Sequence, residues 1–127
     1  MDKFEALFAE YPCVLTDELV KTNTADILAK HTEENNTREV WMQCLNQIDL
    51  TTLNGDDTTE KVATMAQKVN DFDGHFPGVP NVAAMCVYPA LVETAREVLT
   101  EPIGIAAVAA GFPASQTFIE VKVAEAA

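Results

Sequence analysis

Basic residues are scarce in this sequence, which has 8 Lys and Arg residues against 20 Asp and Glu residues and a formal net charge of -12. A surface that binds nucleic acid or an anionic membrane needs clustered positive charge, because both partners are polyanions. We therefore expect neither a nucleic-acid partner nor a membrane partner. A phosphorylated substrate would need positive charge supplied from elsewhere.

Cysteine is also sparse and follows no pairing or metal-binding pattern. Cys13, Cys44 and Cys86 are odd in number, scattered and outside any Cys-x-x-Cys spacing, which indicates free thiols in a reducing compartment. The first residues show no basic segment followed by an apolar one, and no later run reaches about 18 apolar residues. These absences predict a cytoplasmic chain.

Several site signatures are missing as well. The 5 glycines form neither a phosphate-binding loop nor a dinucleotide-binding fingerprint, and metal-ligand spacings are absent. His31 is expected at the end of an N-terminal helix and His75 in a loop, so neither indicates a catalytic histidine. The lysines are expected on helices or in the N-terminal region, where none has the desolvated position that a nucleophilic amine needs.

The length of 127 residues and the hydrophobic fraction of 48% are enough for one domain with a buried core. Residues 1–46 have the pattern of short helices, with possible N-caps at Thr16 and Thr24 and a polar loop from Thr32 to Asn36. No chemistry is visible in this part. We interpret residues 1–46 as a helical N-terminal extension.

Three continuous apolar runs follow, and a helical pattern comes after each. The predicted strands are Gln47–Leu53, Val82–Val87 and Ile105–Ala110. The first of the following helices has an apolar face and a possible cap at Asp57; the face consists of Val62, Met65, Ala66 and Val69. Such units predict an α/β fold with a parallel sheet, either open or part of a barrel. In both architectures chemistry gathers at the carboxyl ends of the strands.

Asp49 places a carboxylate inside the first apolar run. A buried carboxylate is costly unless it is paired or hydrogen-bonded, so Asp49 is either a core aspartate that bonds a neighbouring loop or a site residue. Thr51 alternates onto the same side of the strand, where the two residues could hold a water or a hydroxyl. Cys86 lies at the equivalent end of the second strand and either packs as a small side chain or lines a pocket.

Residues 47–127 carry a series of short motifs whose order and spacing resemble the opening part of deoxyribose-phosphate aldolase. The motifs are Asp49–Asn54, Asp57-Thr58, Glu60–Val62, Cys86–Pro89, Gly111–Pro113 and Glu120–Lys122. Each is weak alone, and together they are specific. Residues 1–46 resemble only loosely the helical segment that precedes the first strand of the barrel in that family.

The resemblance implies a (β/α)8 TIM barrel that reversibly cleaves 2-deoxyribose 5-phosphate to glyceraldehyde 3-phosphate and acetaldehyde. As a class I aldolase, the family uses a lysine Schiff base and needs neither a metal nor another cofactor. Carried over to this sequence, Asp49 matches an active-site aspartate. Four further residues match substrate-binding or pocket-lining positions: Thr51, Leu53, Cys86 and Phe112.

A complete barrel takes roughly 250 residues, so residues 47–127 correspond to the first three βα units of an incomplete TIM barrel. The family's Schiff-base lysine, main proton-relay aspartate and phosphate site have no counterpart here. The expectation is therefore the N-terminal portion of the aldolase, inactive alone and prone to form a homo-oligomer. The alternative is a non-catalytic βα module with a structural or partner-binding role. An open doubly wound binding domain is disfavoured by the lack of a phosphate loop after the first strand.

Overall fold

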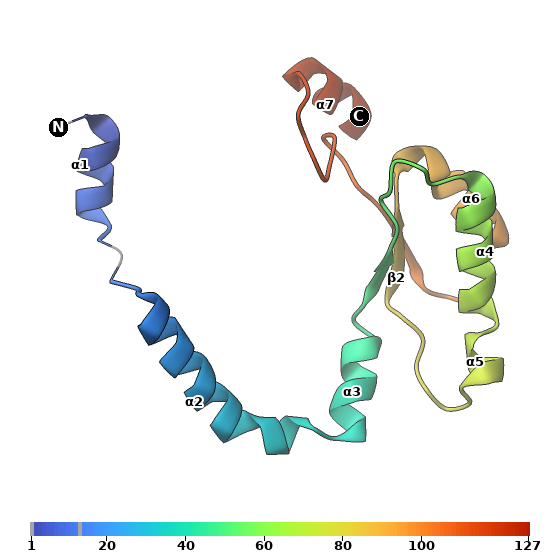
Figure 1. The fold of residues 1–127 in the computed structure, drawn as a ribbon. Helices are drawn as coiled ribbons and strands as arrows, with labels where there is room; N and C mark the ends of the chain where they lie inside the picture. The colour runs from blue at the N-terminus through green and yellow to red at the C-terminus, as the bar shows by residue number, and fades with distance from the viewer. Residues whose placement is uncertain (1, 13) are drawn as a thin grey trace. The chain divides into compact units, whose positions relative to one another are not determined.

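The computed structural model describes residues 2–12 and 14–127 (Figure 1). The chain divides into two compact units, residues 1–37 and 38–127. The domain boundary expected after residue 46 was drawn where the family resemblance begins. That boundary stays a prediction. Cys13, one of the three expected free thiols, lies outside the described residues, while Cys44 and Cys86 are free thiols.

The first unit contains two helices, α1 (Lys3–Glu10) and α2 (Asp17–Asn35). Asp2 caps α1 by accepting hydrogen bonds from the backbone N–H groups of Phe4 and Glu5 at 2.7 and 3.0 Å. Thr16 caps α2 as predicted, accepting from the backbone N–H of Leu19 at 3.2 Å. No described residue of either helix is buried. The two helices of this unit are therefore stabilised by their caps and by hydrogen bonds within each helix, and not by a buried core.

Two expectations for the first unit were wrong. Thr24 lies inside α2 and does not cap a separate helix, and the predicted loop from Thr32 onward is helical as far as Asn35. The polar side chains bond back to the helix: the Thr32 hydroxyl donates to the Leu28 carbonyl at 2.6 Å, and the Asn35 side chain donates to the His31 carbonyl at 2.8 Å. These bonds satisfy the groups that would otherwise favour a loop.

The second unit alternates helices with three short strands. In chain order its elements are α3 (Arg38–Leu45), β1 (Asp49–Thr51), α4 (Thr59–Asn70), α5 (Phe72–His75), β2 (Ala84–Val87), the 3-10 helix η1 (Pro89–Leu91), α6 (Val92–Val98), β3 (Gly104–Ala107) and α7 (Ile119–Ala126). The strands form one sheet in the order β1-β2-β3, with both pairs parallel. The α/β class and the parallel sheet are confirmed, while three strands do not make a closed barrel.

The core of this unit lies between the sheet and the helices α4 and α6, which run side by side (Figure 1). The apolar face predicted for α4 packs inward: Val62, Ala66 and Val69 are buried, and Met65 is half-buried against them. The remaining core residues are Val82, Met85, Val87, Leu91 and Ala95. The helical period of 3.6 residues thus placed one stripe of α4 against the sheet.

All three strands are shorter than predicted. β1 begins at Asp49 and not at Gln47, and Ile48 is 45% exposed. Val82 lies before β2 but is buried in the core, so its apolar character reflects packing and not strand structure. β3 ends at Ala107, and the backbone soon turns at Ala110, whose φ of 61° is in the left-handed region.

Candidate functional site

The two faces of the sheet carry different side chains. Strand alternation and the register place six residues on the face opposite the core, in two rows across the sheet. The first row is Asp49, Ala84 and Gly104, and the second row is Thr51, Cys86 and Ala106. These residues are exposed or half-buried. We call these two rows the open face. Its polar side chains come from β1 and β2, and small residues fill the rest.

Asp49 is exposed, so the expectation of a carboxylate within the apolar centre of the domain was wrong. The first run is apolar on one side only: Leu50 is half-buried against the core while Asp49 and Thr51 face away from it. Thr51 lies on the side of Asp49 as predicted, but its hydroxyl donates to the Asp49 backbone carbonyl at 2.8 Å. The Asp49 carboxylate therefore stays available to another group.

Three of the five predicted site residues come together on the open face. Thr51 and Cys86 are register partners on adjacent strands, and Asp49 is one step before Thr51 on the same side. Leu53 is half-buried just beyond β1, while Phe112 lies in the loop after β3 with 51% of its surface exposed. The structure thus gathers Asp49, Thr51 and Cys86 and places Phe112 at a separate loop.

The loop after β1 is organised by a residue that the sequence had suggested as a helix cap. Asp57 does not cap α4, because the cap is Thr58, whose hydroxyl accepts from the backbone N–H of Lys61 at 3.2 Å. The Asp57 carboxylate instead accepts from the Thr52 hydroxyl and from the Asn54 backbone N–H, both at 2.9 Å. The Lys61 ammonium lies 2.6 Å from it.

This network shifts the protonation equilibria of both charged groups. The Lys61 ammonium, helped by the Thr52 and Asn54 donors, holds the pKa of Asp57 below its ordinary value of 3.8 against the opposing effect of burial. Asp57, with a smaller contribution from Asp56, raises the pKa of Lys61 above 10.5. Lys61 is therefore a protonated counter-ion and cannot serve as a neutral amine near pH 7.

A second bond fixes the same loop from β2. The hydroxyl of Tyr88, which directly follows β2, donates to the backbone carbonyl of Leu53 at 2.9 Å. The backbone N–H of Thr52 also donates to the Cys86 carbonyl at 3.1 Å and extends the strand pairing by one residue. The carboxyl ends of β1 and β2 are thus tied together.

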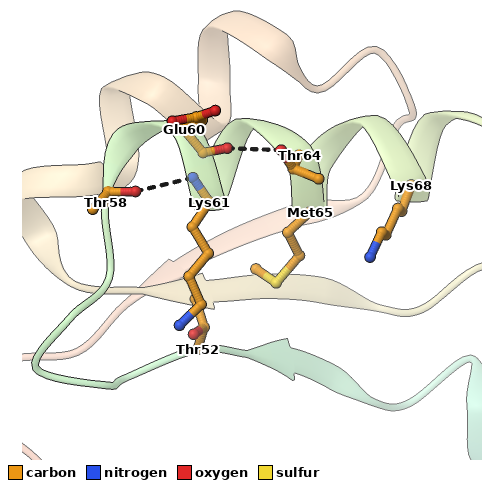
Figure 2. Close-up of a pocket in the computed structure, with 7 residues that line it drawn as sticks. All are labelled: Thr52, Thr58, Glu60, Lys61, Thr64, Met65 and Lys68. Atoms are coloured by element: carbon orange, nitrogen blue, oxygen red, sulfur yellow. Dashed lines mark hydrogen bonds between the residues drawn. The ribbon is translucent and has the colours of Figure 1, made fainter.

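Two hollows adjoin this loop on different sides. One, of about 490 Å³, runs along α4 on the helix side of the sheet and is shown in Figure 2. Its lining residues are Thr52, Thr58, Glu60, Lys61, Thr64, Met65 and Lys68. Figure 2 shows the Lys61 side chain crossing from α4 toward Thr52. Because Asp49 and Thr51 face the other side of the sheet, this hollow is separate from the predicted site.

The second hollow, of about 460 Å³, lies at the carboxyl ends of β1 and β2. Glu125 of α7 lines this hollow together with residues that follow β1 and β2. These residues are Asn54, Gly55, Asp57, Tyr88, Pro89, Ala90 and Leu91. The Glu125 carboxylate accepts a hydrogen bond from the Gly111 backbone N–H at 2.6 Å. This hollow is where parallel α/β architectures place their chemistry.

Within residues 2–12 and 14–127, no group of three or more His, Cys, Asp and Glu side chains is arranged to hold a metal ion. Across the same residues, no helix has both the length and the apolar character to cross a membrane.

Sequence reasoning missed the roles of Asp57, Lys61 and Tyr88. The spacing of four residues between Asp57 and Lys61 was a usable signal, because an acid four residues before a lysine favours pairing at a helix start. Nothing local marked the Tyr88 hydroxyl, since its acceptor at Leu53 is 35 residues away in the sequence.

Comparison with curated proteins finds deoxyribose-phosphate aldolases among the matches. No family model matches the chain. Deoxyribose-phosphate aldolase from Homo sapiens is 35% identical over 112 residues, and the one from Bos taurus is 33% identical over the same length. Each match covers 78% of this chain but 35% of the relative, so the chain spans about a third of the length of these curated relatives. The resemblance seen in the motifs is thereby confirmed: this chain is related in sequence to the deoxyribose-phosphate aldolases.

Proposed function

We propose that this chain forms the N-terminal portion of a deoxyribose-phosphate aldolase and contributes the first three βα units of its TIM barrel. The reaction is the reversible cleavage of 2-deoxyribose 5-phosphate to glyceraldehyde 3-phosphate and acetaldehyde. The observation that carries the proposal is the grouping of Asp49, Thr51 and Cys86 on the open face of a parallel sheet. On the basis of the family resemblance, these three residues are proposed to belong to the site.

The proposed chemistry gives this chain one wall of the site. In a class I aldolase a lysine amine condenses with the substrate carbonyl and releases water, and the protonated imine accepts the electron pair when the carbon–carbon bond breaks. Asp49 has an exposed carboxylate on the open face, suited to hold or transfer a proton during these steps. Thr51, Leu53, Cys86 and Phe112 are proposed to bind the substrate.

The nucleophilic lysine is proposed to come from polypeptide outside these residues. A Schiff base needs a nearly neutral amine, and Lys61, on α4 and paired with Asp57 of the loop after β1, has a raised pKa. The phosphate of the substrate likewise calls for positive charge that a chain of net charge -12 does not concentrate at its strand ends.

Borohydride trapping tests the assignment of the nucleophile. Acetaldehyde and borohydride together reduce any imine to a stable secondary amine, so mass spectrometry reports the modified residue. We expect no lysine of the 127-residue chain to be labelled stoichiometrically and selectively. Selective labelling of one lysine would contradict the proposal that the nucleophile lies elsewhere.

A chimera tests the function itself. In the Homo sapiens relative, the segment that this chain matches is replaced by the chain, and cleavage of 2-deoxyribose 5-phosphate is measured with a coupled assay for glyceraldehyde 3-phosphate. Activity above that of the truncated relative supports the proposal. A folded chimera without activity favours the alternative, a non-catalytic βα module. The observation that supports this alternative is the raised pKa of Lys61, which makes Lys61 unsuitable as a nucleophile.

A further inference from the structure

One peptide group after β1 is held on both of its polar atoms by residues from different elements. The Leu53 carbonyl and the Asn54 N–H belong to the same peptide unit. Tyr88 donates to the carbonyl oxygen at 2.9 Å, and the Asp57 carboxylate accepts from the N–H at 2.9 Å. In a trans peptide the C=O and N–H point in opposite directions, so these two side chains grip one rigid plane from opposite sides.

The Asp57 side of this grip is itself fixed. The Asp57 side chain is only 1% exposed, and Lys61 and Thr52 donate to it along with Asn54. A buried carboxylate that accepts several hydrogen bonds has few alternative orientations, because any rotation would leave a charged oxygen unpaired. Lys61 belongs to the first turn of α4, so the carboxylate is anchored to that helix.

These bonds do more than begin α4. Thr58 already supplies the N-cap of that helix, and the Asp57 carboxylate reaches back to Thr52 and Asn54 at the end of β1. Tyr88 reaches the same loop from β2. Three elements thus converge on the peptide that sets the direction of Leu53.

The geometry points to Asp57 and Tyr88 as positioning residues that fix the Leu53–Asn54 peptide and so hold Leu53 at the carboxyl end of β1. This inference rests on the proposed function, in which Leu53 contacts the substrate. Neither residue needs to touch the substrate for this role. Lys61 supports it by keeping Asp57 in place as a charged acceptor.

Nuclear magnetic resonance on the isotope-labelled 127-residue chain tests the role without catalysis. Tyr88→Phe removes only the hydroxyl that bonds the Leu53 carbonyl. Because both side chains hold one plane, this change is expected to speed hydrogen exchange of the Asn54 amide, which Tyr88 does not touch, by about five- to tenfold. The residual dipolar coupling of that amide should change as well. Tyr11→Phe, which removes an exposed hydroxyl from the first unit, is the matched control.

Variants of the charged pair provide the second arm. Lys61→Met should also speed exchange at Asn54, and Lys61→Arg should restore it, because arginine keeps the positive charge beside Asp57. Lys68→Met removes a lysine from the same helix as a control. Asp57→Asn is expected to raise the exchange rate most. If Asp57→Asn does not fold, the Tyr88→Phe, Lys61→Met and Lys61→Arg variants still test the positioning role.

The inference is overturned if Tyr88→Phe leaves the exchange and the dipolar coupling of the Asn54 amide as they are in the parent chain. It is also overturned if Lys61→Arg and Lys61→Met behave alike. Neither result depends on aldolase activity. An active chimera combined with an unaffected Asn54 amide would refute the positioning role alone, whereas an inactive chimera with a strongly affected amide would refute the proposed function alone.

Discussion

The two faces of the three-stranded sheet serve different needs. The face toward α4 and α6 presents Met85 and Val87, both fully buried, beside half-buried Leu50 and Ile105. The open face presents Asp49 and Thr51 together with alanine, glycine and cysteine. Apolar burial on the first face stabilises the fold. Residues on the open face do not pack in the core, so their side chains are available to contact a ligand.

The largest expected effect separates the two faces by stability. Met85→Ala removes a fully buried side chain and should lower the free energy of unfolding by about 2–5 kcal/mol, because it leaves a cavity against α4 and α6. Cys86→Ala, the next residue on the opposite face, should lower it by less than about 1 kcal/mol. Urea denaturation followed by circular dichroism gives both values. Equal losses would show that the open face is packed after all.

The second prediction separates the faces by activity. In the chimera described above, Asp49→Asn should lower turnover by about 100-fold or more, since a proton-transferring carboxylate would be lost. In the 127-residue chain alone, the same substitution should leave the free energy of unfolding within about 0.5 kcal/mol, because the carboxylate is exposed there. Asp73→Asn, in α5 before β2, is the matched control and should leave turnover nearly unchanged. Comparable losses in the two variants would exclude the proposed orientation of the site.

The third prediction concerns association through the open face and the outer edges of β1 and β3, the strands at the two ends of the described sheet. Such edges bind further strands, so the isolated chain is expected to form dimers or larger species at micromolar concentration. Burying several hundred Å² of apolar surface is worth on the order of 10 kcal/mol before association costs. Repulsion at a net charge of -12 is screened beyond about 8 Å at physiological salt.

Sedimentation in about 0.15 M salt measures this association. Ala106→Glu places a like charge on the open face of β3 and should weaken association by about tenfold, the effect of about 1.4 kcal/mol. Ala124→Glu makes the same charge change on exposed α7 and serves as the control. A cooperative, well-folded monomer at all concentrations would contradict the expectation.

The smallest expected effect lies on the helix side and depends on pH. Because the pKa of Asp57 is lowered in the folded chain, its ionised form contributes stability that is complete above pH 3.8 and is lost as the pH falls below it. The difference in unfolding free energy between the parent chain and Asp57→Asn should therefore shrink as the pH is lowered through this range. Asp73→Asn provides the comparison. A difference that stays constant down to about pH 2 would show that the charge of Asp57 does not matter.

The parallel sheet was predictable because buried strands leave a signal in the sequence. The apolar runs around Leu50, Met85 and Ile105 gave three strands, and the spacing of Val62, Ala66 and Val69 gave the helix α4, whose buried face joins the same core. The rule that chemistry gathers at the carboxyl ends of strands then placed Thr51 near Cys86, and the register confirms that they are neighbours.

The exposure of Asp49 and the organisation of the loop after β1 were not predictable in the same way. A run of apolar residues does not reveal which face of a three-residue strand a helix will cover, so Asp49 was assigned to a buried centre. Asp57 and Thr58 are both good caps, and the sequence does not decide between them. The choice depends on Thr52 and Lys61, which bond the Asp57 carboxylate only once the loop is folded.

The small side chains of the open face leave space above the sheet in which larger side chains could be introduced. A methyl group added at Gly104 would sit 3.3 Å from the Ala84 side chain, so the first row is already near its size limit. In the next row Cys86 and Ala106 are only half-buried, and the core residues Met85 and Ile105 secure the same strands from the other side. Enlarging Ala106 step by step would narrow the space above the sheet while leaving the folding energetics nearly untouched. Under the proposed function, the size of the substrate that this face accepts would change without a change in the fold.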